Sequence, residues 1–536
     1  MPERERRWNG WGFAGESFPV PAAARAWLAK RVGAGDALPV VAEGEIHVPP
    51  PRLLPTFPAV AVTSPEARLR AACGHSLPDL LALRTGAIAA FPDAVCLPET
   101  AERVVKILEV ASAAGVVVIP RGGGTSVVGG VTIRPGPRPV VVLSLERLRG
   151  LVSVDTTSGL ATFRGGTLGP EVEAALAAHG LRLGHEPQSF ELSSVGGWVA
   201  TRSAGQRSTG IGTIDALVAG VEVATPTGLW RLPAQPASAS GPELRRLVGG
   251  SEGRLGVITE ATLRVRPLPE TEDGLVVLLP GWAAGMEVCR ELLQTGVPLE
   301  VLRLSDPFET AFAMTLVALS PVAARARRML FGLRRYRHGC LLLLGWAGSA
   351  QEVTLAENAA ARVWREAGGL GLGRGGWRRW RAERFRHPYL RDELLSAGWG
   401  ADTLETAAPW ADLGSVYVAV REAMGAASER HGFHVAVLCH LSHAYRDGAS
   451  LYFTFLWPLA SGAEHTQWSA LKLAATESLL AAGGTLTHHH GVGTMHAPYL
   501  EREVGRTGVA ALSALARELD PQGVLNPGVL LREGDR

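Results

Sequence analysis

Three consecutive histidines, His488, His489 and His490, are the residues of this chain best suited to moving protons. An imidazole has an ordinary pKa of about 6.5, so it can accept and release a proton close to neutral pH. The triplet follows Gly483-Gly484 and precedes Gly491, which favours a loop or strand end beside a ligand. A metal site and a surface tract are the alternatives, but three adjacent side chains point in different directions and cannot all ligate one ion.

A glycine-rich loop offers a different chemistry, the binding of an anion by backbone N–H groups. It follows the apolar run Val116–Ile119 and consists of Pro120, Arg121, Gly122, Gly123, Gly124, Thr125, Ser126 and the residues up to Gly130. Three glycines remove every Cβ and permit positive φ, so the backbone can approach a phosphate closely. The spacing is not GxGxxG, and Gly130 stands where a P-loop has lysine. A tight solvent loop is the alternative.

Two further segments of the same region carry hydroxyl groups and glycines. In the segment 184–198, Ser193 or Ser194 suits a helix N-terminus, where unpaired N–H groups accept an anion. The segment 249–259 leads into a strand. Each loop alone is a weak signal, but three of them together predict one extended dinucleotide held between two small subdomains.

Composition sets the class of protein. With 536 residues, of which 46% are hydrophobic and 19% charged, the chain is globular and long enough for two or more domains. A net charge of +2 argues against a dedicated nucleic-acid binder. Five scattered cysteines without a CxxC spacing predict reduced, buried thiols.

Targeting signals are not evident in the sequence. No apolar run reaches the roughly 18 residues that a membrane-spanning helix needs. The N-terminus has no apolar stretch of a secretory signal, and the C-terminus is not a peroxisomal tripeptide. We therefore expect a cytoplasmic protein.

Strand and helix patterns alternate along the chain, which predicts an α/β or α+β nucleotide-binding domain followed by a second α+β domain on an antiparallel sheet. The expected strands are Val95–Leu97, Val116–Ile119, Pro139–Leu145, Gly274–Leu279, Cys340–Leu344, Val435–Leu441 and Ser450–Phe455. One expected helix begins at 98–100 and ends near Ala114. The others span Ala284–Gln294, Ala350–Ala367, Asp412–His431, 463–482 and 498–518. The expected domains are an N-terminal arm and helical region (1–85), a cofactor domain (86–270), a substrate domain (271–460) and a C-terminal helical segment packing back on the cofactor domain (461–536).

Taken together, the three loops resemble the FAD-binding domain of the vanillyl-alcohol oxidase family, and the segment 520–528 is similar to that family's C-terminal signature. Within this family, the chain resembles the alkyldihydroxyacetonephosphate synthases, also called alkylglycerone-phosphate synthases. The runs that carry the resemblance are Arg7–Gly12, Gly184–Ala204, Gly250–Gly253, Glu405–Trp410 and His488–Gly493. The glycine loops are common to many flavin oxidases, whereas the histidine triplet and Trp-Asn-Gly-Trp-Gly are more specific.

The resemblance implies an α+β fold: a two-subdomain FAD-binding domain of vanillyl-alcohol oxidase type and an α+β cap domain with an antiparallel sheet. It also implies a flavin-dependent transferase that exchanges the acyl chain of acyl-dihydroxyacetone phosphate for a long-chain fatty alcohol. No histidine is preceded by a covalent-flavin signature, so we expect the FAD to be bound non-covalently. This exchange forms the ether bond of ether lipids without net redox change, with the flavin N5 holding the dihydroxyacetone phosphate between the two half-reactions. An FAD-linked 2-hydroxy acid dehydrogenase or oxidase with the same domain pair is the alternative.

The resemblance also assigns residues. It gives an acid/base role to Tyr452, rather than Tyr445, and places the triplet in the active site, handling the alcohol's proton. It assigns binding of the substrate phosphate to Arg391 and a further substrate-binding role to Arg303. Without it, Tyr452 reads as a core tyrosine and Arg391 as half of a surface ion pair. The residues expected to contact FAD are Pro120, Arg121, Gly122, Gly123, Gly124, Thr125, Ser126, Gln188, Ser189, Ser194, Gly197, Thr201, Ser203, Glu252, Gly253, Gly256, Val257 and Ile258.

The chain departs from the synthases at several positions. Arg121 stands where an apolar residue is usual, Gln188 where an aspartate is typical, and Thr494-Met495 where basic residues are usual. Two arginine-dense stretches, 323–337 and 374–381, favour a solvated face, then a surface for an anionic membrane, and last a nucleic-acid surface. From the sequence we expect an anionic membrane surface as a peripheral partner, and a homodimer is compatible with it.

Overall fold

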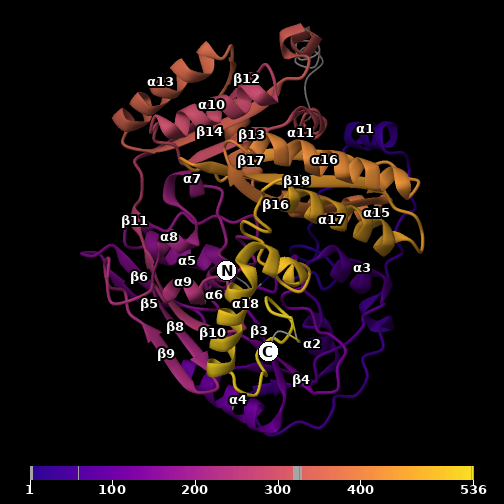
Figure 1. Cartoon of the computed structure of the whole chain (residues 1–536), viewed down its shortest axis with the longest axis vertical. Coiled ribbons are helices and arrows are strands. Elements are labelled where there is room, and N and C mark those ends of the chain that lie inside the picture. Colours follow the sequence, from indigo (N-terminus) through magenta and orange to yellow (C-terminus); the bar gives the residue numbers. More distant parts are fainter. Residues whose placement is uncertain are drawn as a thin grey trace.

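The computed structural model describes residues 4–57, 60–317, 325, 329–332, 334–532 and 534. It has two lobes stacked along the long axis (Figure 1). The first lobe contains the glycine loop, and the second is built on one large sheet. This is the mixed α+β architecture that the sequence predicts.

The first sheet of the first lobe has the strand order β1-β2-β4-β3. Its strands are β1 (Val60–Val62), β2 (Ala94–Leu97), β3 (Val117–Arg121) and β4 (Val140–Ser144). Strands β2, β4 and β3 are parallel, and α4 (Ala101–Ala114) connects β2 to β3. The glycine loop leaves the carboxyl end of β3, where open α/β sheets bind ligands.

The second sheet of this lobe is antiparallel, in the order β5-β6-β10-β8-β9. Its strands are β5 (Leu151–Asp155), β6 (Leu160–Arg164), β8 (Val218–Thr225), β9 (Gly228–Leu232) and β10 (Val257–Arg264). The helices of this part are α5 (Gly169–Ala177), α6 (Val195–Thr201), α7 (Ser208–Ile211), α8 (Ile214–Leu217) and α9 (Arg245–Val248). The short strands β7 (Leu181–Arg182) and β11 (Arg266–Pro267) pair with each other. The predicted N-cap is confirmed, because Ser194 Oγ accepts from the N–H of Gly197 at the start of α6.

The second lobe is a seven-stranded antiparallel sheet in the order β15-β12-β14-β13-β17-β18-β16. Its strands are β12 (Thr271–Leu279), β13 (Val301–Ser305), β14 (Cys340–Gly348), β15 (Leu370–Gly373), β16 (Trp399–Pro409), β17 (Ala436–Ser442) and β18 (Gly448–Pro458). One face packs against α10 (Trp282–Gln294), α13 (Ala350–Glu366), α16 (Leu413–Arg430) and α17 (Glu464–Ala481). The other face meets α1 (Ala22–Arg31), α11 (Pro307–Ala313), α14 (Gly375–Glu383) and α15 (His387–Ser396).

Strand alternation on this sheet decides which side chains can reach a ligand. Leu302, Leu304, Leu441 and Phe453 belong to the large core under α10, α13, α16 and α17. Their neighbours in sequence point to the opposite face, because successive side chains of a strand alternate. Arg303, His440 and Tyr452 therefore share the face that looks toward the first lobe.

The two ends of the chain tie the lobes together. The N-terminal region holds η1 (Glu43–Glu45), α2 (Pro65–Arg70) and α3 (Leu77–Thr85) besides α1. After η2 (Arg334–Tyr336) in the second lobe and η3 (Ala497–Tyr499), α18 (Leu500–Leu519) lies across the first lobe (Figure 1). The backbone of Val118 then pairs with Val524 and Asn526, so the tail extends the first lobe.

The predicted strands and helices are all present, with ends displaced by a few residues. All five cysteines are free and buried, as predicted. Within the described part of the chain, no helix is long and apolar enough to cross a membrane. In the first arginine-dense stretch, 323–337, residues 323–324, 326–328 and 333 lie outside the described residues.

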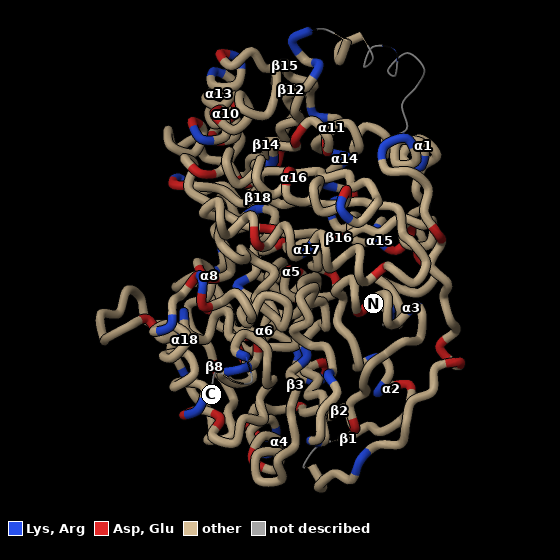
Figure 2. The backbone as a smooth tube through the Cα atoms, turned by 45° about the vertical axis from the view of Figure 1, so that its right-hand side comes forward, with Lys and Arg blue, Asp and Glu red and all other residues tan. Residues whose placement is uncertain are grey.

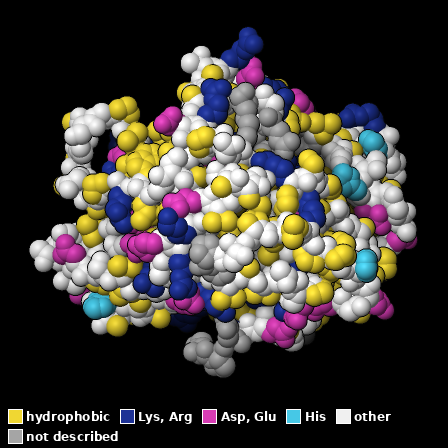
Figure 3. Space-filling model, turned by 90° about the horizontal axis from the view of Figure 1, so that it is seen from below, with side chains coloured by type: hydrophobic (Ala, Val, Ile, Leu, Met, Phe, Trp, Pro, Cys, Tyr) yellow, Lys and Arg dark blue, Asp and Glu magenta, His cyan; other side chains and the backbone are white. Residues whose placement is uncertain are grey.

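Charges of both signs are mixed over the described part of the molecule (Figure 2). Basic and acidic residues are mixed along both lobes (Figure 2). On the face seen from the end of the first lobe, the two signs are interspersed among apolar side chains (Figure 3). Among the described residues of this face, we see no extended single-sign field of the kind that attracts nucleic acid (Figure 3).

Candidate active site

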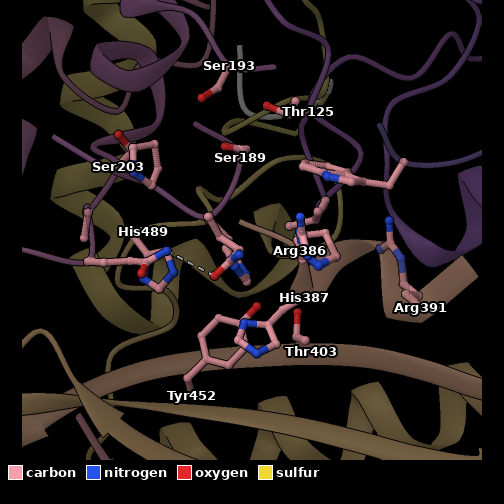
Figure 4. Close-up of a pocket in the computed structure, with 18 of the residues that line it drawn as sticks. Thr125, Ser189, Ser193, Ser203, Arg386, His387, Arg391, Thr403, Tyr452 and His489 are labelled. Atoms are coloured by element: carbon pink, nitrogen blue, oxygen red, sulfur yellow. Dashed lines mark hydrogen bonds between the residues drawn. The ribbon is translucent and has the colours of Figure 1, made fainter. Parts of the chain in front are cut away.

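A cavity of about 1130 Å³ lies between the two lobes. This volume exceeds the roughly 300–1,000 Å³ of pockets for a single small molecule, so it can hold a cofactor and a substrate together. Figure 4 shows hydroxyl side chains such as Thr125 and Ser189 opposite Tyr452 and Thr403, which rise from the large sheet. All of the residues predicted to contact FAD line this cavity.

The wall of the first lobe is mostly backbone. A Cβ at Gly123 would overlap the carbonyl oxygen of Leu192, and a Cβ at Gly122 would overlap Ser194 Oγ. A Cβ at Gly253 would press on Pro120 at 3.0 Å. The three loops thus pack on one another without room for side chains, which leaves N–H groups and hydroxyls to face the cavity. This cradle fits the pyrophosphate and ribose of a dinucleotide such as FAD.

Arg121 supports the glycine loop from one side. Its Nη1 donates to the carbonyl of Cys73 at 2.9 Å and its Nη2 to that of Arg70 at 3.3 Å. The guanidinium lies where a Cβ of Gly124 would be, and Gly124 has φ +71°. The unusual arginine therefore ties the loop to the α2–α3 connection.

The C-terminal signature joins two of the loops. Asp520 accepts from the N–H groups of Val524 and Leu525, at 3.0 and 2.8 Å, and so forms a tight turn. In that turn Asn526 Nδ2 donates to the carbonyls of Gly130, at 2.9 Å, and Glu252, at 2.8 Å. The signature thus holds the first and third loops in contact.

Tyr452 stands at the centre of the opposite wall. Its ring stacks on His440, with ring centroids 4.9 Å apart, and lies 5.9 Å from the ring of His489. Burial raises the pKa of Tyr452 to about 12, although a hydrogen bond from Thr403 opposes this. The phenol is therefore protonated near neutral pH. Tyr445 lies outside the cavity lining.

The histidine triplet divides into two parts. His489 and His490 line the cavity, whereas His488 does not and turns its Nε2 to the hydroxyl of Tyr445, 2.7 Å away. Burial lowers the pKa of all three imidazoles, and the negative charge of Glu405 opposes this shift. The two cavity histidines are thus neutral near pH 7 and can accept a proton.

Arg391 enters the cavity from α15 (Figure 4) and donates from Nη1 to the carbonyl of His75 at 2.9 Å. It is not half of a surface ion pair, because its neighbour Asp392 is buried and accepts from the N–H of Trp11 at 2.5 Å. Cβ atoms at Gly10 and Gly12 would press on Asp392 and Tyr389 respectively. The Trp-Asn-Gly-Trp-Gly run therefore packs on α15 and holds Arg391 in place.

Arg303 belongs to a charged cluster that sequence reasoning did not identify. Its Nη2 donates to Glu309 Oε1 at 2.8 Å, and His440 Nδ1 lies 3.0 Å from the same oxygen. His440 and Arg303 hold the pKa of Glu309 below its usual range despite its burial. Burial, together with Arg303, lowers the pKa of nearby His387 to about 4. The spacing His440-x2-His443 was the available signal for part of this cluster.

Part of the cavity lining is apolar, and we call this part the apolar arm. It is lined by side chains from α11, the large sheet, α14 and α15, together with residues of the N-terminal segment. They are Phe18, Pro19, Pro21, Phe312, Met314, Leu316, Val317, Leu341, Leu343, Leu372, Trp380, Leu390 and Leu394. An arm of this composition suits a hydrocarbon chain.

The other departures from the synthase pattern have local partners. Gln188 donates from Nε2 to the carbonyl of Arg384 in the second lobe, which an aspartate could not do. Thr494 packs on Gly129, and the N–H groups of Thr494 and Met495 point to the carbonyl of Val128 at 3.1 and 3.3 Å. These residues fasten the histidine segment and the second lobe to the cofactor loops.

One group of described residues brings potential metal ligands together. Ligand atoms of Glu405, His488 and His489 lie within 4.8 Å of one another. The oxygens of Glu405, however, already accept from the backbone N–H groups of the triplet and from Thr487 Oγ1. Both carboxylate oxygens therefore already accept hydrogen bonds from the chain, which disfavours this group as a metal site.

Comparison with protein families divides the chain in two. Residues 92–232 match the family described as "FAD binding domain". Residues 268–530 match "FAD linked oxidases, C-terminal domain". The three predicted loops fall in or between these two matches.

Individual relatives match most of the chain. It is 30% identical over 512 residues to the alkyldihydroxyacetonephosphate synthase of Dictyostelium discoideum, covering 92% of this chain and 84% of the relative. It is 31% identical over 474 residues to that of Trypanosoma brucei brucei, covering 87% and 77%. A solved alkyldihydroxyacetonephosphate synthase superposes with a TM-score of 0.85 at 26% identity, over 97% of this chain and 98% of that one. p-Cresol methylhydroxylase, at 13% identity over 88% and 94% with a TM-score of 0.67, shares the fold alone.

Proposed function

Because the chain belongs to the alkyldihydroxyacetonephosphate synthase family, we propose that it is an FAD-dependent enzyme that exchanges the acyl chain of acyl-dihydroxyacetone phosphate for a long-chain fatty alcohol. The product carries the ether bond of ether lipids, and the reaction has no net redox change. One observation carries the proposal: a single cavity joins a glycine-lined wall, a wall of acid/base side chains and an apolar arm.

The first-lobe wall fits FAD, because it combines backbone close to the cavity with a row of hydroxyl groups. Bound FAD supplies an electron-poor ring system that takes up and returns an electron pair during the exchange. We expect the cofactor to dissociate on denaturation, since no covalent-flavin signature precedes a histidine. Intact-protein mass spectrometry after denaturation checks this.

Tyr452 and the cavity histidines are suited to opposite proton transfers. Environments that push the pKa values of neighbouring groups apart are a usual way to separate an acid from a base. The raised pKa of Tyr452 keeps its phenol protonated, so it can donate to the substrate. The lowered pKa of His489 and of His490 keeps them neutral, so they can take the proton of the fatty alcohol.

Arg391 is the better of the two arginines for the substrate phosphate. A guanidinium is permanently charged and can bind two phosphate oxygens. Arg303 is already paired with Glu309, whereas Arg391 uses Nη1 on a backbone carbonyl. The hydrocarbon chain of the same substrate would extend into the apolar arm from this point.

We include an anionic membrane surface as a peripheral partner, since both lipid substrates reside in bilayers. The supporting feature is α14, where Trp380 lines the cavity and Arg378, Arg379 and Arg381 are exposed. Flotation with anionic vesicles at low salt tests this, with glutamine at the three arginines as the comparison. Absence of flotation would identify a solvated face. Light scattering of the same sample tests for a homodimer.

The reaction itself is tested with purified, FAD-loaded protein. We expect labelled fatty acid or fatty alcohol to exchange with acyl-dihydroxyacetone phosphate while the flavin stays oxidised overall. An FAD-linked 2-hydroxy acid dehydrogenase would instead lose flavin absorbance with lactate or glycolate. Flavin bleaching by a hydroxy acid without lipid exchange would overturn the proposal.

A further inference from the structure

The segment that carries the histidine triplet is held by carboxylates from three distant parts of the chain. Glu503 of α18 accepts from the N–H of Leu486 at 2.6 Å. Glu252, from the third cofactor loop, accepts from the N–H groups of Val492, at 2.6 Å, and Gly493, at 2.9 Å. Between these two anchors lies Glu405 of β16.

Glu405 accepts from four consecutive residues, 487–490. The donors are Thr487 Oγ1 at 2.5 Å and the backbone N–H groups of His488, of His489 at 3.2 Å and of His490 at 2.8 Å. The side chain of Glu405 is 1% exposed, so these donors and the imidazoles, rather than water, stabilise its negative charge. One carboxylate thus fixes the backbone of the whole triplet.

The strand register places the same carboxylate beside Tyr452. In the antiparallel pair β16–β18, Glu405 is directly opposite Tyr452. In the pair β17–β18, Tyr452 is directly opposite His440. Directly opposed side chains lie on the same face of a sheet. His440, Tyr452 and Glu405 therefore form one row across three strands, and the triplet is fastened to the end of that row.

Glu405 acts on the triplet through its negative charge as well as through its hydrogen bonds. Each imidazole is buried, and burial lowers its pKa. Glu405 is the first charge that opposes this shift at all three histidines. Without it, a proton arriving on the triplet would be a buried cation without a counter-charge, which is strongly unfavourable.

We propose that Glu405 is a positioning residue that holds the histidine triplet against Tyr452 and stabilises the imidazolium formed when the triplet takes the proton of the fatty alcohol. The inference rests on the proposed function. In this step the alcohol O–H bond breaks and an imidazole N–H bond forms. The freed oxygen electron pair forms the ether C–O bond. Over the whole exchange this bond replaces the C–O bond to the carboxylate, which departs with its electron pair in the first half-reaction, and the imidazolium proton passes to solvent.

The test compares two variants that separate charge from size. Glu405→Gln keeps the length of the side chain and removes its charge, whereas Glu405→Asp keeps the charge on a shorter side chain. We expect Glu405→Gln to lower kcat for lipid exchange about 100-fold, with FAD content and KM for acyl-dihydroxyacetone phosphate close to those of the natural protein. Glu405→Asp is expected to recover part of that loss.

Glu503→Gln is the matched control, because it also removes a carboxylate bound to the backbone of the segment. It acts at Leu486, outside the row, and we expect kcat within about twofold of the natural value. Equal kcat losses in Glu405→Gln and Glu503→Gln would contradict the proposal. A higher kcat in Glu405→Gln than in Glu405→Asp would also contradict it. Loss of FAD from both Glu405 variants would assign the residue a structural role and also overturn it.

Amide hydrogen exchange of the FAD-loaded protein supplies a readout besides activity. We expect Glu405→Gln to accelerate exchange at residues 488–490, and Glu503→Gln to accelerate it at 486 while leaving 488–490 protected. Unchanged protection at 488–490 in Glu405→Gln would remove the positioning role. Should the natural protein show no lipid exchange, the proposed function fails, while this measurement still decides how the triplet is held.

Discussion

The two walls of the cavity are built in opposite ways. The first-lobe wall consists of loops whose glycines bring backbone N–H groups and short hydroxyl side chains to the cavity. The second-lobe wall consists of long side chains that rise from a regular antiparallel sheet, in a row set by strand register. Binding through backbone depends on missing Cβ atoms, whereas proton transfer depends on particular functional groups. Substitutions should therefore separate cofactor retention from turnover.

Replacing Tyr452 with phenylalanine is expected to have the largest effect on activity. The change removes only the hydroxyl that we propose as the proton donor to substrate, so lipid exchange should fall about 1,000-fold or more while FAD stays bound. Tyr445→Phe is the matched control, since that hydroxyl meets His488 outside the cavity lining. Steady-state exchange rates and flavin absorbance measure both quantities. A Tyr452→Phe variant with full activity would remove the tyrosine from the mechanism.

Gly123→Ala should affect the opposite wall, with loss of cofactor rather than of chemistry. The new Cβ would overlap the carbonyl of Leu192, and backbone cannot move aside as a flexible side chain can. We expect FAD affinity to fall about tenfold or more. Gly136→Ala serves as the control because nothing lies within 4 Å of a Cβ there. Equal FAD affinity in both variants, measured by fluorescence titration, would show that the loop does not bind cofactor through close backbone.

Arg391→Ala should act on the substrate rather than on the cofactor. Loss of a charge-assisted contact to phosphate is expected to raise KM for acyl-dihydroxyacetone phosphate roughly 10- to 100-fold. Arg506→Ala, which replaces an exposed arginine of α18, should leave KM unchanged. Kinetics with varied substrate concentration make the comparison. An unchanged KM in Arg391→Ala would reassign the phosphate site.

The smallest effect is expected at Glu252, where the two walls meet. Burial raises the pKa of Glu252 from 4.5 to about 7, although the N–H groups of Val492 and Gly493 oppose this. The folded state thus binds a proton more tightly than the unfolded state, so this residue's contribution to stability falls as pH rises from 4.5 to 7. The shift corresponds to roughly 3 kcal/mol at most. Relative to Glu252→Gln, the natural protein should lose a few degrees of Tm between pH 5 and pH 8, and parallel Tm curves would contradict the assignment.

Local patterns account for much of what could be foreseen. The N-cap at Ser194, the glycine loop after β3 and the helices α10, α13 and α16 follow from short-range steric and hydrogen-bonding preferences. The strands β13 and β16 were not predicted. Strand β13 contributes Arg303 to the face of the sheet that lines the cavity, and β16 contributes Glu405. The polar residues in these two segments obscured the apolar pattern from which a strand is predicted.

Other features depend on contacts between segments far apart in the chain. No local spacing indicates that Trp11 binds Asp392, or that Arg121 binds the carbonyl of Cys73. The same holds for the charged cluster of Glu309, His387 and His440, which forms only where α11, α15 and β17 converge.

The sequence by itself determined the residue types: glycines that expose backbone, imidazoles that titrate near neutral pH, and a chain able to hold two lobes. The tertiary structure decided which of these groups face one another. It divided the triplet, with His489 and His490 at the cavity and His488 behind, and set Tyr452 rather than Tyr445 opposite them. The physical reason is that strand register and the hold of Glu405 on the triplet are long-range properties, absent from any local stretch of sequence.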